Sequence, residues 1–220
     1  MTARAALYYV PDLDDPLWDA GCAWLGRDPA SGRRMQALVG DEVTADPRGY
    51  GFHATLKPPF RLAHGWFALV EDTEAMAARI APFALPPLHV ADLGGFLALR
   101  ETRPCAGLHS LADACVTGLD AHRLPADAAE IARRRKNGLT PAQDAMLLDW
   151  GYPHVLATWR FHMTLTRRLS PAEHAEICPQ AERHFAPALA EPRSVTSVCL
   201  FTQAGPDAPF VLAERVRLRG

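Results

Sequence analysis

The order of apolar and polar positions predicts a chain of alternating strands and helices. An apolar run over residues 5–10, ended by Pro11, indicates a strand. Apolar residues at helical spacing indicate a helix over 16–25. Residues 26–49 are polar and rich in Gly, Asp and Arg, which favours a long loop, either alone or with one short helical piece.

Strand and helix patterns continue through the rest of the sequence. Strand patterns cover 52–57, where Pro58 and Pro59 stop the run, and then 88–93, 96–100, 160–166, 195–201 and 210–216. Helical patterns cover 71–84, 108–119, 126–136, 141–150 and 171–185. Each half thus offers one strand, a helix and two further strands, which predicts an α+β fold made of two related lobes.

A predicted helical segment separates the two lobes. We expect a single bilobal domain over 1–220, with approximate lobes 1–104 and 151–220 and a helical insertion at 105–150. No low-complexity linker divides the sequence, so the lobes are expected to pack closely. With 220 residues and 49% hydrophobic content, the chain is long enough to bury a sizeable core.

One five-residue pattern occurs twice, with a single variable position. It reads Phe-His-Ala-Thr-Leu over 52–56 and Phe-His-Met-Thr-Leu over 161–165. The His-x-Thr core alone is common by chance, whereas the full frame is expected in roughly 0.003 copies per random chain of this composition. Two copies at long spacing indicate a duplicated unit rather than a solenoid.

Strand alternation gives each copy of this pattern two faces, because successive side chains of a strand point to opposite sides. The polar faces carry His53, Thr55 and Lys57 in the first copy and Arg160, His162, Thr164 and Thr166 in the second. Each His is then either an ordinary polar residue of an amphipathic strand or part of a matched acid–base pair. The duplication favours the matched pair, since it accounts for both copies at once.

Composition excludes several classes of protein. A net charge of −2 argues against a dedicated DNA-binding protein, which needs a strong basic surplus. No basic segment followed by an apolar run is present near the start, and no stretch of about 18 apolar residues occurs. We therefore expect a soluble, cytoplasmic protein without a membrane partner.

The cysteines and histidines do not form a metal motif. The five cysteines contain no CxxC pair, and the nine histidines contain no HExxH pattern. We therefore expect reduced cysteines, no metal site and no cofactor.

The duplicated motif, in a two-lobed α+β chain, resembles the 2H phosphoesterase superfamily, which includes cyclic phosphodiesterases and RNA 2′,5′-ligase-like proteins. The wider wording over 50–60 and 159–166 resembles an uncharacterised branch associated with phosphonate-breakdown operons. The segments Leu-Gly-Gly-Phe at 93–96, Arg-Arg-Arg at 133–135 and Gly-Tyr-Pro at 151–153 resemble it too. The resemblance implies two pseudo-symmetric lobes of antiparallel sheet with flanking helices around a central cleft.

The same resemblance implies roles for four residues. His53 and His162 would be the general base and general acid, and Thr55 and Thr164 would hold the phosphate. The chemistry agrees, because an imidazole with a pKa near 6.5 is able to take or give a proton at neutral pH. Which histidine is acid and which is base stays open.

Further residues are candidates for substrate binding. Lys57, Arg160 and Thr166 would hold a second phosphate or a ribose hydroxyl, or else form a solvated strand end. Either Tyr8 or Tyr9 would line the cleft, but not both, because neighbours in a strand point oppositely; the alternative is an aromatic of the core or rim. The basic run over 133–136 is either a phosphate clamp or a solvated helix face.

Our leading hypothesis is a metal-independent phosphodiesterase that acts on a small cyclic phosphate ester of a sugar or nucleotide. One alternative is an RNA end-processing enzyme of the 2′,5′-phosphodiesterase or ligase-like kind. RNA is the less favoured partner, because basic and aromatic residues do not interleave. Another alternative is a non-catalytic module that binds a nucleotide or other anion. The expected partner is a small phosphorylated substrate.

Overall fold

The computed structural model describes residues 4–136 and 138–220. Its helices are α1 (Pro16–Leu25), α2 (Asp41–Tyr50), α3 (Trp66–Ala77), α4 (Ala106–Gly118), η1 (Asp120–His122), α5 (Ala128–Arg135), α6 (Pro141–Trp150), η2 (Leu156–Thr158) and α7 (Pro171–Leu189). Its strands are β1 (Arg4–Tyr9), β2 (Ala54–Arg61), β3 (Phe83–Leu85), β4 (Leu88–Asp92), β5 (Leu97–Glu101), β6 (Met163–Thr164), β7 (Arg193–Val195), β8 (Ser197–Gln203) and β9 (Val211–Arg217).

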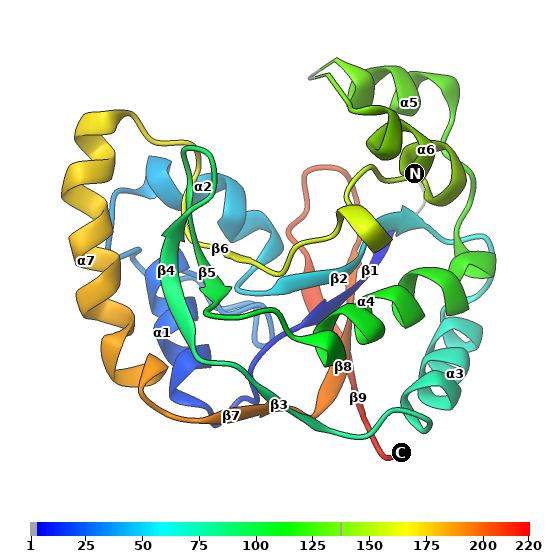
Figure 1. Cartoon of the computed structure of the whole chain (residues 1–220), viewed down its shortest axis with the longest axis horizontal. Helices are drawn as coiled ribbons and strands as arrows, with labels where there is room; N and C mark the ends of the chain where they lie inside the picture. The colour runs from blue at the N-terminus through cyan, green and yellow to red at the C-terminus, as the bar shows by residue number, and fades with distance from the viewer. Residues whose placement is uncertain (1–3, 137) are drawn as a thin grey trace.

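Seven of these strands form one antiparallel sheet in the order β4-β5-β6-β2-β1-β8-β9, and β3 pairs with β7 separately. Figure 1 shows α7 beside β4 on one side of the molecule, with α3 and α4 toward the other. The predicted α+β fold with antiparallel sheet and flanking helices is confirmed. No described helix is both long and apolar enough to cross a bilayer.

Strand β1 lies inside the sheet, between β2 and β8, and is buried on both faces. Its odd-numbered residues, such as Leu7 and Tyr9, belong to the main core, whereas Ala6 and Tyr8 belong to a second, smaller core. The smaller core also contains Trp18 of α1 and aromatic residues near β8. Burial on both sides explains why the β1 sequence is apolar throughout rather than alternating.

Strand β2 continues through Pro58 and Pro59, where the sequence predicted a stop. In its pairing with β1, Leu7 lies opposite Lys57 and Ala5 lies opposite Phe60, so the register shifts between these pairs. The two prolines fall within this irregularity, where a missing backbone N–H disrupts no regular ladder bond.

The loop expected over 26–49 contains most of α2, in the place of the short helical piece. Buried Arg48 stabilises this helix by donating to the carbonyl oxygen of Leu25 at 2.7 Å and to Thr44 Oγ1 at 2.6 Å. Two other predictions differ from the structure. Helix α3 covers 66–77 instead of 71–84. The second motif strand, expected over 160–166, is reduced to the two residues of β6.

The predicted lobes are interleaved in space. Strand β6, from the expected second lobe, lies between β5 and β2 of the expected first lobe. The expected insertion at 105–150 is helical and contains α4, α5 and α6. Figure 1 shows α5 and α6 as a projection beside the end of β1. Helix α6 begins with a capping box, in which Thr140 accepts from Gln143 N and Gln143 reaches back to Thr140 N.

A close approach between α1 and the first motif yields a stability prediction. A Cβ at Gly21 would overlap the buried ring of Phe52, the residue that precedes His53. We expect Gly21→Ala to lower the free energy of unfolding by about 1–3 kcal/mol in urea denaturation, because overpacking displaces Phe52. Gly118→Ala is the matched control, since nothing lies within 4 Å of its Cβ position. Equal stability of wild type and Gly21→Ala would contradict this packing.

Candidate active site

The two copies of the motif lie side by side on neighbouring strands. Ala54 of β2 pairs with Met163 of β6, and these are the variable positions of the two motifs. Continuing this antiparallel register by one residue places His53 opposite Thr164 and Thr55 opposite His162. Opposite side chains have Cβ atoms about 4.5–5.5 Å apart, and diagonal neighbours are about 7–8 Å apart. This register therefore predicts that each histidine faces the threonine of the other motif, with the two imidazoles diagonal to each other.

Apolar residues of the motifs hold both strands in the core. Phe52, Leu56, Phe161 and Leu165 are all fully buried. Their burial orients the alternate residues, the two His-x-Thr pairs, toward the opposite face, where all four are half-buried. The indole of Trp159 links the two motif segments further, because its Nε1 donates to the carbonyl oxygen of Thr55 at 2.8 Å.

Both imidazoles are oriented by the same kind of hydrogen bond. His53 Nδ1 donates to the carbonyl oxygen of Gly51, and His162 Nδ1 donates to that of Arg160, each at 2.9 Å. A carbonyl only accepts, so Nδ1 carries the proton and Nε2 of the neutral ring is an acceptor. At His53 this Nε2 accepts from Thr55 Oγ1 at 3.1 Å. The two motifs therefore present their histidines in the same tautomer.

The surroundings favour neutral imidazoles. Burial lowers the pKa of His53 to about 4, against a bond to Gly51 that raises it, and the positive field of His162 lowers it further. Burial also lowers the pKa of His162, opposed by its bond to Arg160. Near neutral pH both rings are therefore predominantly uncharged bases in the free protein.

Tyr8 supports His53 from the smaller core. It lies opposite Thr55 in the β1–β2 pairing, and its ring contacts that of His53 with centroids 3.8 Å apart and planes tilted by 31°. Its hydroxyl is buried and has no hydrogen-bond partner among the described residues. Tyr9 points the other way, into the main core beside Phe161. Of the two tyrosines, Tyr8 is thus the one on the histidine face, beneath His53 rather than in the pocket.

A pocket of about 580 Å³ opens beside the motifs. Its wall includes Thr55, His162 and the exposed Arg160, whereas His53 and Thr164 are not part of the lining. The rest of the wall includes Phe96, Thr140, Gln143, Tyr152, His154 and Thr158. The Leu-Gly-Gly-Phe segment at 93–96 and the Gly-Tyr-Pro segment at 151–153 gave a signal for this wall, whereas His154 had none.

Lys57 and Thr166 share the polar strand pattern but are not brought to the pocket. Lys57 is 2% exposed, and its Nζ donates to the carbonyl oxygen of Val116 at 2.9 Å and lies 3.3 Å from Asp120 Oδ1. Thr166 is 1% exposed and accepts from the backbone N–H of Leu97 at 3.0 Å. Both side chains therefore serve internal hydrogen bonds in place of the expected substrate contacts.

The basic run over 133–136 divides among several environments. Arg135 makes a two-point contact with Asp144 at 2.6 and 2.8 Å on the surface. Arg134 donates to Glu130 at 2.9 Å, and its guanidinium lies over the ring of Tyr152, 4.7 Å from the centroid. Arg134 thus braces one residue of the pocket wall. Across the described ranges, no three His, Cys, Asp or Glu side chains gather as a metal-ligand set.

Comparison with known proteins places the chain in a family. A family model described as "Protein of unknown function (DUF1045)" matches residues 55–211, and the chain belongs to this family. One similar protein is the ribose 1,5-bisphosphate phosphokinase PhnN of Janthinobacterium sp. (strain Marseille), 39% identical over 99% of this chain and 51% of the relative. The protein of the same name from Laribacter hongkongensis (strain HLHK9) is 36% identical over 98% and 52%. The chain spans about half the length of these relatives.

Solved structures with a similar arrangement include one described as a phosphoesterase and E. coli LigT complexed with 3′-AMP. The TM-score is 0.46 for each, at 14% and 13% sequence identity, and the matches cover 100% of this chain and of both structures.

Proposed function

We propose that the chain is a phosphodiesterase of the 2H phosphoesterase type that hydrolyses a small cyclic phosphate ester. The observation that carries the proposal is the antiparallel pairing of Ala54 with Met163, which brings the two motifs together on neighbouring strands. Continued by one residue on each side, this register predicts each imidazole opposite the threonine of the other copy. Matched Nδ1 bonds leave Nε2 of each ring as the atom for proton transfer, and at His53 a bound substrate takes the place of the Thr55 hydroxyl that Nε2 now accepts from. Chance duplication of an ordinary strand does not explain both features.

The reaction is an in-line displacement at phosphorus. A water oxygen bonds to phosphorus as the bond from phosphorus to one ester oxygen breaks. One imidazole takes the proton of the water through Nε2, and the other, entering as imidazolium, gives its proton to the leaving alkoxide. The hydroxyls of Thr55 and Thr164 donate to the non-bridging oxygens, whose charge builds in the transition state. The product is a phosphate monoester, and no metal is needed for any of these transfers.

A phosphoribosyl cyclic phosphate is the substrate class that the relatives favour. Their name concerns ribose 1,5-bisphosphate. Opening a phosphoribosyl 1,2-cyclic phosphate at the ribose O2 yields that compound. The pocket volume of about 580 Å³ suits a sugar phosphate, and exposed Arg160 offers a cation for a second phosphate.

Hydrolysis assays followed by ³¹P NMR test the proposal. Purified protein is incubated with EDTA and either nucleoside 2′,3′-cyclic phosphates or a phosphoribosyl 1,2-cyclic phosphate. We expect a monoester signal that EDTA does not diminish. Loss of activity on chelation would remove the metal-free part of the mechanism. Binding without turnover of any substrate would favour a non-catalytic module, and salt-sensitive binding of RNA oligomers would favour the RNA alternative.

The lowered pKa values predict an acidic optimum for kcat/KM. The base must be neutral and the acid protonated. The pH profile of kcat/KM is therefore bell-shaped, with its maximum between the pKa values of the two imidazoles in the free protein. Because His53 titrates near pH 4 and burial lowers the pKa of His162 as well, we expect the maximum below pH 6.5 and a decline as the pH rises. An anionic substrate favours imidazolium, which moves the kcat profile to higher pH. A kcat/KM maximum above pH 7 would contradict these roles.

A further inference from the structure

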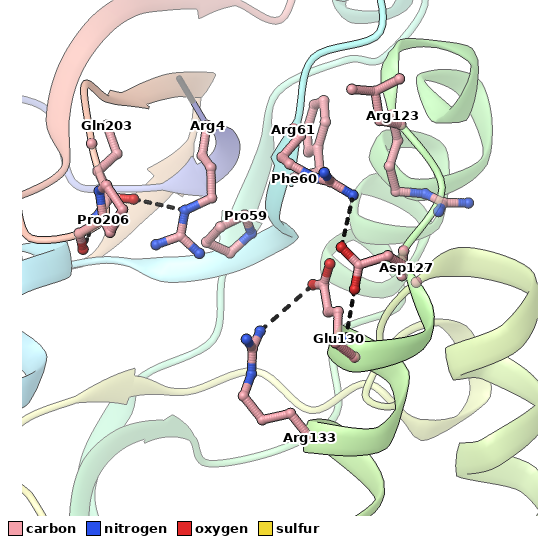
Figure 2. A pocket seen from close by; sticks show the side chains of 15 residues that line it. Arg4, Pro59, Phe60, Arg61, Arg123, Asp127, Glu130, Arg133, Gln203 and Pro206 are labelled. Carbon is pink, nitrogen blue, oxygen red and sulfur yellow. Dashed lines mark hydrogen bonds and ion pairs between the residues drawn. The ribbon is translucent and has the colours of Figure 1, made fainter. Parts of the chain in front are cut away.

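A second pocket, of about 600 Å³, lies where the α5–α6 projection meets the sheet. Figure 2 shows Arg4 and Arg61 on the strand side and Glu130 and Arg133 on the helix side. Arg123 and Asp127 also line it. This pocket shares no lining residue with the one beside the histidines.

Two of these arginines lie directly opposite each other. Arg4 of β1 pairs with Arg61 of β2 in the antiparallel register. Like charges in opposite positions of a sheet repel and destabilise the pairing. Asp127 Oδ2, 3.7 Å from the Arg61 guanidinium, offsets part of this repulsion. An anion bound between the two strands would offset the rest.

Arg4 is held in a fixed orientation. Its Nε donates to Gln203 Oε1 at 2.7 Å. Gln203 is 6% exposed, and its Nε2 donates to the carbonyl oxygens of Pro206 and Ala208. The amide is therefore locked with its oxygen toward Arg4. Within the described chain no carboxylate lies within 4 Å of the Arg4 guanidinium, so the two terminal nitrogens are available to a ligand.

The carboxylates of the pocket are largely committed to other cations. Arg123 is neutralised by Asp120, which it contacts at 2.8 and 2.9 Å. Glu130 binds Arg134 at 2.9 Å and is 3.9 Å from Arg133, whose side chain is 69% exposed. Because Asp127 compensates part of the charge of Arg61, the remaining positive charge of the pocket comes mainly from Arg4 and Arg133.

The arginine pocket lies apart from the histidines on the same face of β1. Arg4 and Tyr8 are four residues apart in this strand, a distance of about 13 Å at about 3.3 Å per residue. The two pockets also share no lining residue, so a ligand of the arginine pocket does not depend on whether the proposed reaction occurs.

We propose that this pocket binds a sugar phosphate through its phosphate monoester. Guanidinium groups recognise phosphate by two-point hydrogen bonds, and Arg4 presents both terminal nitrogens for this contact. The volume exceeds the need of inorganic phosphate and suits a small phosphorylated molecule. Phe60, the aromatic residue of the lining, is 5% exposed and offers no face for a nucleotide base.

Arginine side-chain NMR gives a readout local to this pocket. The Nε–H signal of Arg4, assigned by its loss in Arg4→Gln, is followed while ribose 5-phosphate is added. We expect a saturable shift in wild type. In Arg133→Gln, an exposed substitution that does not threaten folding, we expect the Kd from this signal to rise about tenfold or more, because one charged contact is lost. Arg103→Gln, on exposed chain elsewhere, is the matched control and should keep the wild-type Kd.

Further titrations separate the ligand classes and the two pockets. Inorganic phosphate should bind more weakly than ribose 5-phosphate, and AMP should bind no more tightly. The Arg4 signal should respond equally in His162→Ala, since that residue lines the other pocket. An Arg4 signal that does not move, or that titrates identically in wild type and Arg133→Gln, would overturn the proposal. Tighter binding of AMP than of ribose 5-phosphate would overturn the assignment of a sugar phosphate and indicate a nucleotide as the ligand.

Discussion

Replacing His162 with alanine is expected to lower kcat for a cyclic phosphate ester by about 10²–10⁴-fold, with a smaller change in KM. The reason is that a positioned acid or base acts in the transition state and contributes little to binding of the ground state. His53→Ala is expected to fall in the same range. The double variant should lose much less than the product of the single losses, because the two imidazoles serve one concerted displacement. Steady-state kinetics under EDTA measures all three.

His89→Ala is the matched control for these variants. His89 is an exposed histidine of β4, outside the lining of the pocket. Wild-type activity in His162→Ala would exclude the catalytic role, and equal losses in His89→Ala would show that the effect is not specific to the motif. Circular dichroism of each variant separates a lost proton transfer from a lost fold.

Asp120→Asn is expected to lower the free energy of unfolding by about 3 kcal/mol. This carboxylate faces the ammonium of Lys57, which is 2% exposed, and it also binds Arg123. Removing one partner of a buried ion pair costs about 3–5 kcal/mol, because the other charge is left without compensation. The lower end applies here, since the side chain of Asp120 is 28% exposed. Urea denaturation gives the value.

The double variant Lys57→Met/Asp120→Asn provides the decisive comparison. Because it removes the buried cation as well, it should be more stable than Asp120→Asn alone. Asp144→Asn, which breaks a surface contact with Arg135, should leave stability close to wild type. If adding Lys57→Met makes Asp120→Asn less stable still, the buried ammonium is not the source of the loss.

Local patterns were sufficient for the elements with strong end signals. Helix α6 begins where Thr140 and Pro141 predict, and α7 begins after Ser170, which forms a capping box with Glu173. The residues of each cap lie within a few positions of one another, so a short segment of the sequence is enough to predict it. Helix α2 has no comparable signal, because its Arg48 acts on the distant carbonyl of Leu25. Pro58 and Pro59 predicted the end of the strand wrongly for the same reason. The irregular pairing that accommodates them depends on the distant strand β1.

In the candidate site, too, local patterns predict some residues correctly, whereas others depend on tertiary contacts. The His-x-Thr motifs and their two faces follow from strand alternation alone. The buried position of Lys57 does not follow from alternation, because its partners Val116 and Asp120 come from the helical insertion. The wall formed by Tyr152 and His154 also depends on tertiary packing. Strand alternation predicts the face of the sheet to which a side chain points. The elements that pack on that face determine which residues the side chain contacts.

The pairing of β1 has a consequence for folding. This strand pairs on one side with β2 and on the other with β8, which spans Ser197–Gln203 and lies almost 200 residues further along the sequence. This part of the sheet therefore closes only after residue 203 has been synthesised. Loop closure over such separations is slow, so we expect this chain to fold more slowly than helical proteins of its size. Until then the apolar segment Ala5–Val10 lacks its β8 neighbour, and in a cell we expect chaperone binding to concentrate on this segment.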